Sequence, residues 1–173
     1  MFKPSFDRKS IRLPDFDYSS GGLFFITICI QNHKCLLGKI LHDELKPTPF
    51  GEIVKEEWLS LASSNIILED FVVMPNHIHG IVKLENVSLS LLIRRFKSRT
   101  ANRYIKGVKS HGWVPFNKRV WQRNYYEHII RNDSSHQKIA DYILENPINW
   151  KQDKFFTYCL LYTSDAADDS LRV

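Results

Sequence analysis

The sequence has no long apolar run, and its N-terminus has no secretory signal. No stretch of the 173 residues approaches the roughly 20 apolar residues that a membrane-spanning helix needs. Residues 1–13 are basic and lack the apolar centre of a signal peptide. We therefore expect a cytoplasmic protein with no membrane partner.

Cysteines are also scarce and are not spaced for zinc. The three cysteines are Cys29, Cys35 and Cys159, an odd number without a CxxC pair. Neither a disulfide framework nor a thiolate zinc site is expected from this spacing. Cys29 lies in an apolar stretch and is expected to be a small core side chain.

The overall composition of the chain is that of one globular domain. Hydrophobic residues make up 43% of the chain, aromatic residues 13%, and the formal net charge is +5. Residues 159–173 resemble the in-frame translation of a sequencing-library adapter, although an ordinary acidic tail is the alternative. We expect a single domain over residues 1–158 and a non-native tail over residues 159–173.

The hydrophobic pattern predicts an α+β fold. Runs of β-branched and aromatic residues predict strands over 23–30, 66–74, 77–84 and 120–130. Apolar residues at helical spacing predict helices that begin at residues 48 or 49, 88 or 90, and 134 or 135. The second helix should end near residue 105, and Pro147 should end the third.

The predicted order of these elements is that of a ferredoxin-like or RRM-like fold. The elements follow the order strand, helix, strand, strand, helix, strand. This order gives an antiparallel sheet with helices on one face. An extra C-terminal helix, which carries Tyr142, is then added. The strand over residues 77–84 should be central. Because this architecture supports many functions, the fold alone predicts none.

Two histidines two residues apart suggest a metal site. In a strand, alternate side chains share a face, so His77 and His79 point the same way while Ile78 points to the other face. Histidine is a common metal ligand, and buried imidazoles flanked by apolar strands need a polar partner such as a metal ion. Isolated His-x-His patterns also arise by chance, so a purely structural role stays open.

One predicted helix carries positive charge with no acidic residue to oppose it. Residues 94–109 include seven cations: Arg94, Arg95, Lys97, Arg99, Arg103, Lys106 and Lys109. A solvated helix face usually mixes both signs, so the run favours contacts with nucleic-acid phosphates over a merely soluble surface. We expect DNA contacts from Arg94, Arg95, Lys97, Arg99 and Arg103, with Arg123 extending the positive surface.

Several tyrosines could act as a nucleophile beside a metal ion. Tyr125 and Tyr126 lie in the predicted strand over 120–130, whereas Tyr142 lies on the last helix with Asn146 one turn later. The i, i+4 spacing places the phenol of Tyr142 and the amide of Asn146 on one helix face, which favours this pair. The alternative is a packed core tyrosine followed by an asparagine that ends the helix.

These residues together resemble a known family. His77-Ile78-His79, the segment from Tyr142 to Pro147, and residues 8–14, 24–32 and 121–131 are similar to those of the single-tyrosine HUH transposases. The REP-associated tyrosine transposases (RAYTs) are the branch that the sequence resembles most. The resemblance covers residues 8–156.

The resemblance implies a metal-dependent endonuclease and strand transferase that acts on single-stranded, hairpin or REP-like DNA. Tyr142 would be the nucleophile and would form a 5′-phosphotyrosine intermediate. His77, His79 and Asn146 would hold Mg2+ or Mn2+. Many relatives carry glutamine where this chain has Asn146, whose side chain is one methylene shorter, so direct ligation by Asn146 stays open.

Two other functions remain as alternatives. The chain could be a non-catalytic ferredoxin-like module that binds nucleic acid, or a metal-dependent hydrolase that activates water. The sequence leaves open the DNA target, the choice between monomer and homodimer, whether the tyrosine acts in its own subunit, and whether the protein mobilises itself or is domesticated.

Overall fold

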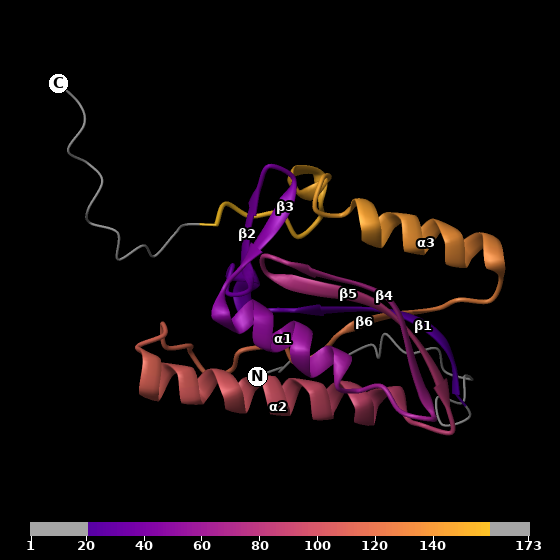
Figure 1. Cartoon of the computed structure of the whole chain (residues 1–173), viewed down its shortest axis with the longest axis horizontal. Helices are drawn as coiled ribbons and strands as arrows, with labels where there is room; N and C mark the ends of the chain where they lie inside the picture. The colour runs from indigo at the N-terminus through magenta and orange to yellow at the C-terminus, as the bar shows by residue number, and fades with distance from the viewer. Residues whose placement is uncertain (1–20, 160–173) are drawn as a thin grey trace, which may run out of the picture.

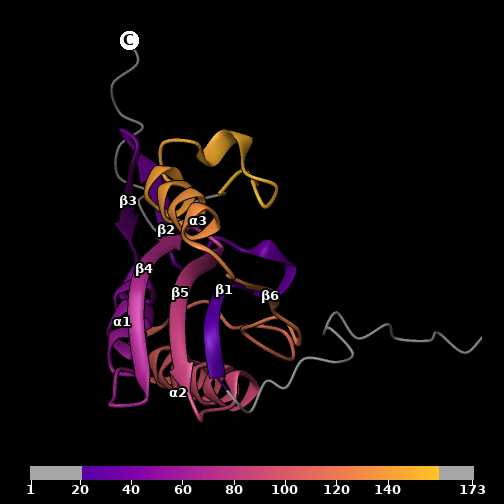
Figure 2. The ribbon, with the colours of Figure 1, turned by 90° about the vertical axis from the view of Figure 1, so that its right-hand side faces the viewer.

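A four-stranded antiparallel sheet forms the centre of the protein. The computed structural model describes residues 21–159, so the segment of the resemblance at 8–14 and most of the expected tail lie outside the described residues. The strands are β1 (Gly21–Cys29), β4 (Ile66–Met74), β5 (His77–Glu85) and β6 (Tyr126–Ile129), in the order β4-β5-β1-β6. Figure 2 shows these strands side by side. This is the ferredoxin-like order, and β5 is central as expected.

Helices cover both faces of the sheet (Figure 1). Helices α1 (Pro49–Leu59) and α2 (Leu89–His111) pack on one face, where Trp58 and Phe96 join a core that includes Phe24 and Ile26 of β1. Helix α3 (Asp133–Glu145) packs on the other face, where Ile81, Ile130, Ala140 and Ile143 form a second cluster. The expected α+β class, with an extra C-terminal helix that carries Tyr142, is confirmed.

The alternation along β5 determines which side chains face each layer. Ile78 and Val82 belong to the core under α1 and α2, whereas Ile81 belongs to the cluster under α3. Gly80 shares its face with Ile78, and a Cβ there would lie 2.5 Å from Cζ2 of Trp58. The absence of a side chain at residue 80 lets Trp58 lie against β5, and His77 and His79 are left on the face of α3.

Side-chain caps define the start of two helices. Thr48 is the N-cap of α1, and its hydroxyl accepts a hydrogen bond from the Gly51 N–H, as expected from the sequence. Helix α3 begins earlier than expected, because Asn132 is its N-cap and accepts from the Ser135 N–H at 2.8 Å. Helix α2 runs past residue 105 to His111 and ends at Gly112, which has a φ of 68°.

The expected strand over 120–130 is shorter than the sequence suggested. Only Tyr126–Ile129 pairs with β1 along a ladder, and Trp121 makes an isolated bridge to Ile30. Between them, the Lys97 ammonium donates to the carbonyl oxygens of residues 122, 123 and 124 at 2.9, 3.3 and 3.0 Å. These carbonyls point to a side chain instead of a neighbouring strand, so the prediction of a continuous strand was wrong.

A small hairpin was not anticipated. Strands β2 (Gly38–Leu41) and β3 (Glu44–Pro47) pair with each other outside the main sheet. Their turn consists of His42 and Asp43, which have φ angles of 51° and 62°. Both residues take the left-handed conformation that a tight hairpin turn requires. Two short 3-10 turns, η1 (Gln31–His33) and η2 (Trp150–Gln152), complete the described elements.

The cysteines correct one expectation and confirm another. Cys35 and Cys159, 124 residues apart, form a disulfide, which the cysteine spacing did not predict. The bond depends on Cys159, the first residue of the tail that we expect to be non-native. Cys29 is a buried free thiol, as expected. Within residues 21–159, no helix has the length and apolar character needed to cross a membrane.

Candidate metal and tyrosine site

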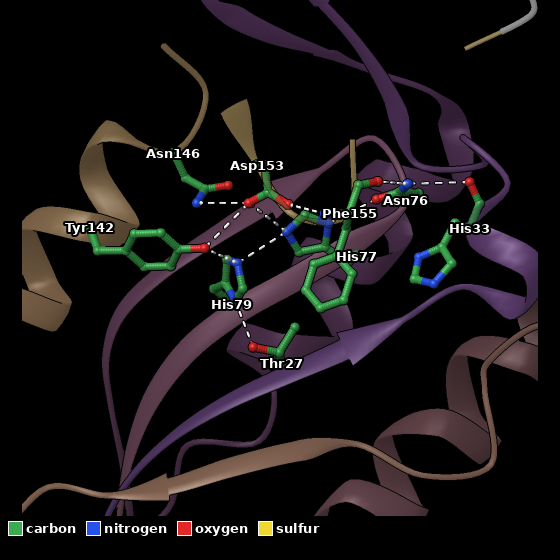
Figure 3. Close-up of polar contacts among 9 residues, drawn as sticks. All are labelled: Thr27, His33, Asn76, His77, His79, Tyr142, Asn146, Asp153 and Phe155. Carbon is green, nitrogen blue, oxygen red and sulfur yellow. Dashed lines mark hydrogen bonds and ion pairs between the residues drawn. The ribbon is translucent and has the colours of Figure 1, made fainter. Parts of the chain in front are cut away.

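The two histidines face each other in the layer between β5 and α3 (Figure 3). Their Nε2 atoms are 3.0 Å apart, and the exposed fractions of His77 and His79 are 0% and 1%. The two side chains therefore point in the same direction, as strand alternation predicts, and their Nε2 atoms are close enough to bind one ion.

A hydrogen bond to the far nitrogen of each ring holds its orientation. Asn76 is fully buried, and its Nδ2 donates to the carbonyl oxygens of His33 and Phe155 at 3.2 and 2.8 Å. Its Oδ1 is therefore left to accept from Nδ1 of His77 at 2.8 Å. The Thr27 hydroxyl contacts Nδ1 of His79, also at 2.8 Å. A proton on each Nδ1 leaves both Nε2 atoms with a lone pair for a cation.

Burial keeps both imidazoles neutral. Loss of solvent lowers the pKa of His77 to about 3, and the positive charges of His33 and Lys154 act in the same direction. The pKa of His79 is also held well below its usual value, first by burial and then by His77. Neutral imidazole is the form that ligates metal ions, so the site is prepared for a cation at neutral pH.

Tyr142 reaches the histidine pair from α3. Its hydroxyl lies 3.3 Å from Nε2 of His79 and 3.3 Å from Oδ2 of Asp153. The ring of Phe25 stacks on His79 with centroids 5.2 Å apart and meets the ring of Tyr142 edge-on at 6.2 Å. Burial, followed by the charge of Asp153, raises the pKa of the Tyr142 phenol. The phenol is thus held in place, with its hydroxyl donating to a carboxylate and its pKa above the usual value.

Asn146 and Asp153 complete the group. Asn146 is buried, and its Nδ2 donates to Oδ2 of Asp153 at 3.4 Å, while its Oδ1 is buried without a hydrogen-bond partner. The same Oδ2 of Asp153 lies 4.0 Å from Nε2 of His77. Oδ1 of Asp153 accepts from the Phe155 N–H at 2.6 Å, which holds the carboxylate toward the histidines.

Sequence reasoning missed Asp153, Thr27 and Asn76. Asp153 follows η2 in a segment with no regular structure, and its side chain is only 2% exposed. The available signals were weak: Asn76 directly precedes the histidine pair, and Asp153 is an isolated acid beyond the last predicted helix. Their roles depend on contacts between distant segments, such as the bond from Asn76 to Phe155 across 79 residues.

The donor set fits a divalent cation. One nitrogen each from His77 and His79 and one oxygen from Asp153 all lie within 4.8 Å of one another. Adjacent ligands of an octahedral ion bound at about 2.1 Å lie about 3.0 Å apart, which matches the observed separation of the two Nε2 atoms. Imidazole nitrogens together with carboxylate and amide oxygens suit a divalent cation, and the unpartnered Oδ1 of Asn146 adds a fourth donor.

The structure does not bring the cations of α2 to this site. Helices α2 and α3 lie on opposite faces of the sheet (Figure 1), and the histidines lie on the face of α3. Arg99 contacts Glu57 at 2.8 Å, and Arg103 contacts Glu56 and Glu57 at 2.6 and 3.2 Å. Lys97 binds the carbonyls of residues 122–124 described above. The expected DNA contacts that remain exposed are Arg94, Arg95 and Arg123.

A sheet-borne histidine pair that meets a helix-borne tyrosine defines the class of single-tyrosine HUH proteins. A family model described as "Transposase IS200 like" matches residues 26–146, and the chain belongs to this family. The matched region includes both histidines, Tyr142 and Asn146, and it ends before Asp153.

Individual relatives agree with this family. The chain is 37% identical over 167 residues to an uncharacterized protein of Haemophilus influenzae, covering 86% of this chain and 93% of that protein. It is 28% identical over 131 residues to the REP-associated tyrosine transposase of Escherichia coli (strain K12), covering 76% and 69%. A solved REP-associated tyrosine transposase bound to a REP hairpin has the same fold, with a TM-score of 0.56, 24% identity, and coverage of 78% and 71%. The expected RAYT resemblance is confirmed.

Proposed function

We propose that this protein is a metal-dependent endonuclease and strand transferase that forms a 5′-phosphotyrosine on Tyr142. One observation carries the proposal: the Tyr142 hydroxyl lies 3.3 Å from Nε2 of His79, within a group of side chains that can hold a divalent cation. The solved relative was bound to a REP hairpin, which supports hairpin or REP-like single-stranded DNA as the substrate. Action on cellular DNA agrees with the cytoplasmic location expected from the sequence.

The proposed ligand set differs from the one expected from the sequence. His77, His79 and Asp153 would hold Mg2+ or Mn2+, because their donor atoms already converge. Asn146 positions the carboxylate through its Nδ2 and can offer its buried Oδ1 as a further ligand. When bound, the ion would stabilise negative charge on the scissile phosphate and on the leaving 3′ oxygen.

Tyr142 would attack the phosphorus atom. A free phenol has a pKa of about 10 and is a weak nucleophile at neutral pH. In this protein Oδ2 of Asp153 accepts the hydrogen bond of the phenol and can take its proton. A bond forms between the tyrosine oxygen and phosphorus, the bond from phosphorus to the 3′ oxygen breaks, and the proton balances the charge on the released 3′ oxygen.

Because one phosphodiester is exchanged for another, the reverse reaction can join the 5′ end to a different 3′ hydroxyl without ATP. Strand transfer therefore needs no second active site. Tyr142 reaches the histidines of its own chain, which supports attack within one subunit. Both a monomer and a homodimer remain compatible with this reaction.

A denaturing gel tests the proposal against both alternatives. Labelled hairpin DNA with single-stranded arms is incubated with the protein and Mg2+, and then denatured. The proposal predicts a covalent protein–DNA band that is lost in Tyr142→Phe, and metal-dependent cleavage that is lost in His77→Ala. Binding without any covalent product would indicate a binding module, and cleavage that is indifferent to Tyr142→Phe would indicate a hydrolase.

A further inference from the structure

We propose that Tyr126 and Lys154 form a docking surface for the single-stranded nucleotide next to the scissile phosphate, with its base stacked on Tyr126 and its phosphate on Lys154. The inference rests on the proposed function and assigns the path of the DNA strand across the sheet. Neither side chain belongs to the group that can hold the cation.

The strand register places Tyr126 beside the histidine site. His79 of β5 pairs with Thr27 of β1, and Thr27 pairs with Tyr126 of β6. Directly paired residues project from the same face of a sheet, so Tyr126 shares the face of His79. Two strand spacings separate their backbones, about 10 Å. That distance suits a nucleotide that neighbours the reacting phosphate.

The ring of Tyr126 is exposed and supported. Tyr126 lies on the edge strand β6 and is 43% exposed. Its ring contacts the ring of Phe155 with centroids 5.8 Å apart, and Phe155 in turn contacts His77 at 4.9 Å. Phe155 is buried, so it fixes the position of Tyr126 relative to the histidine site. Supported, exposed aromatic rings are the platforms on which unpaired bases stack.

A cation accompanies this ring. The ammonium of Lys154 lies 5.2 Å from the centroid of Tyr126 and 4.7 Å from that of Phe155. The residue itself is exposed. A base on the ring would therefore carry its phosphate toward a positive charge. A cation interleaved with aromatic rings is the usual composition of a single-strand binding surface.

The positions of other cations favour a DNA path along β6 instead of along α2. Arg123 is exposed and precedes β6, and the carbonyl oxygens of residues 122–124 are bound by Lys97. The segment that leads into Tyr126 is thus anchored beside an available arginine. The cations of α2 lie across the sheet from the histidines, and Arg99 and Arg103 already contact acidic side chains.

The test compares matched tyrosine and lysine variants of the full chain. The probe is a fluorescein-labelled REP hairpin with single-stranded arms, and binding is measured by fluorescence anisotropy in Ca2+. Tyr126→Ala is expected to weaken binding about 5- to 150-fold, the range for one stacked base. Tyr126→Phe keeps the ring and should change the Kd less than about twofold. Tyr158→Ala, at an exposed tyrosine beyond Phe155, is the control and should bind normally.

The lysine pair provides an independent measurement. Lys154→Gln is expected to lower the slope of log K against log salt by about 0.7, the value for one phosphate contact on a single strand. Lys151→Gln, at another exposed lysine of the same segment, should leave the slope unchanged. Because Lys154 is a surface residue, this measurement does not depend on how well Tyr126→Ala folds.

A fluorescent base gives a third measurement of stacking on Tyr126. A 2-aminopurine placed beside the cleavage position should be quenched by the wild type and by Tyr126→Phe, but not by Tyr126→Ala.

Failure of this inference can be told apart from failure of the proposed function. If the wild type forms the covalent product while Tyr126→Ala and Lys154→Gln bind the arms normally, the strand does not cross this surface and the inference is overturned. If the wild type neither binds the arms nor forms a covalent product, the proposed function itself fails.

Discussion

Single hydrogen bonds orient the two imidazoles that define the site. Thr27 holds His79, and Asn76 holds His77, each through Nδ1. Such contacts behind a metal ligand fix both the tautomer and the angle of the ring. At the residue scale, the quality of the site therefore depends on two side chains that would not themselves touch the ion.

Thr27→Val tests this dependence with little change in volume. The variant keeps the shape of the side chain but removes the hydroxyl that contacts His79. We expect the affinity for Mn2+, measured by isothermal titration calorimetry, to fall about 10- to 100-fold. Thr100→Val is the matched control, because Thr100 is a buried threonine that bonds Phe96, Lys97 and Trp121 in the other layer. Equal Mn2+ affinity in Thr27→Val and the wild type would refute this positioning role.

Lys97 gives a second residue-scale prediction. Burial lowers its pKa from 10.5 to about 8. Between these two pH values the unfolded chain keeps the proton and the folded chain releases it, so the free energy of unfolding rises with pH. Lys97→Met lacks this group. The stability of the wild type relative to Lys97→Met should therefore increase from pH 8 to pH 10.5, as measured by urea denaturation.

A constant difference between the wild type and Lys97→Met over that pH range would contradict the lowered pKa. Comparison of the two proteins removes the contribution of other groups that titrate in the same range, including Tyr104, whose pKa is also shifted. The loss of the hydrogen bonds that Lys97 donates to carbonyl oxygens should lower the stability of Lys97→Met.

At the scale of elements, α2 combines two kinds of cation that look alike in the sequence. Arg99 and Arg103 bind Glu57, whose side chain is 9% exposed. Arg94 and Arg95 are exposed. Arg99 and Arg103 link α2 to α1, so their charges stabilise the packing of the two helices and are not free to bind DNA phosphates.

Two double variants separate these kinds of cation. Arg99→Ala with Arg103→Ala leaves Glu57 partly buried without its partners and should lower the free energy of unfolding by about 1 to 3 kcal/mol. Arg94→Ala with Arg95→Ala should change it by less than about 0.5 kcal/mol. Chemical denaturation measures both. Equal stability of the two double variants would show that the contacts between α1 and α2 contribute nothing measurable.

The elements also show which parts of the fold were readable from the sequence. The strand over 66–74 was predicted with the bounds that β4 has, because its apolar run ends at the Pro75-Asn76 turn. The shared face of the histidines and the i, i+4 relation of Tyr142 and Asn146 follow from local periodicity, and the structure brings these residues together. Local patterns were sufficient wherever the backbone determined the direction of a side chain.

The remaining features depend on contacts between distant segments. The strands of the hairpin, β2 and β3, have only four residues each, and the turn is His42-Asp43 instead of a common Asn-Gly. The shortening of β6 depends on an ammonium about 25 residues away in the sequence. Asp153 joins the site through contacts of the segment after α3. The periodicity of the sequence contains no information about any of these contacts, nor about which face of the sheet α2 and its cations cover.

At the scale of the whole molecule, the residues of the proposed site all lie within the domain expected over residues 1–158. The histidines, Tyr142, Asn146 and Asp153 all precede residue 159, the start of the expected tail. A chain that stops after Tyr158 should keep the fold, the Mn2+ affinity and the covalent activity of the full chain under reducing conditions. Thermal unfolding and the denaturing gel check this prediction. A marked loss in the shortened chain would mean that residues 159–173 are part of the native protein.

Peptide mapping of the covalent product by mass spectrometry tests the central proposal most directly. The wild-type protein is trapped on hairpin DNA with Mg2+, digested with protease and nuclease, and searched for the tyrosine that carries the 5′ nucleotide. We predict that the modified residue is Tyr142, whose hydroxyl already touches His79. A nucleotide on Tyr125 or Tyr126, or cleavage that leaves no modified tyrosine, would contradict the proposed chemistry.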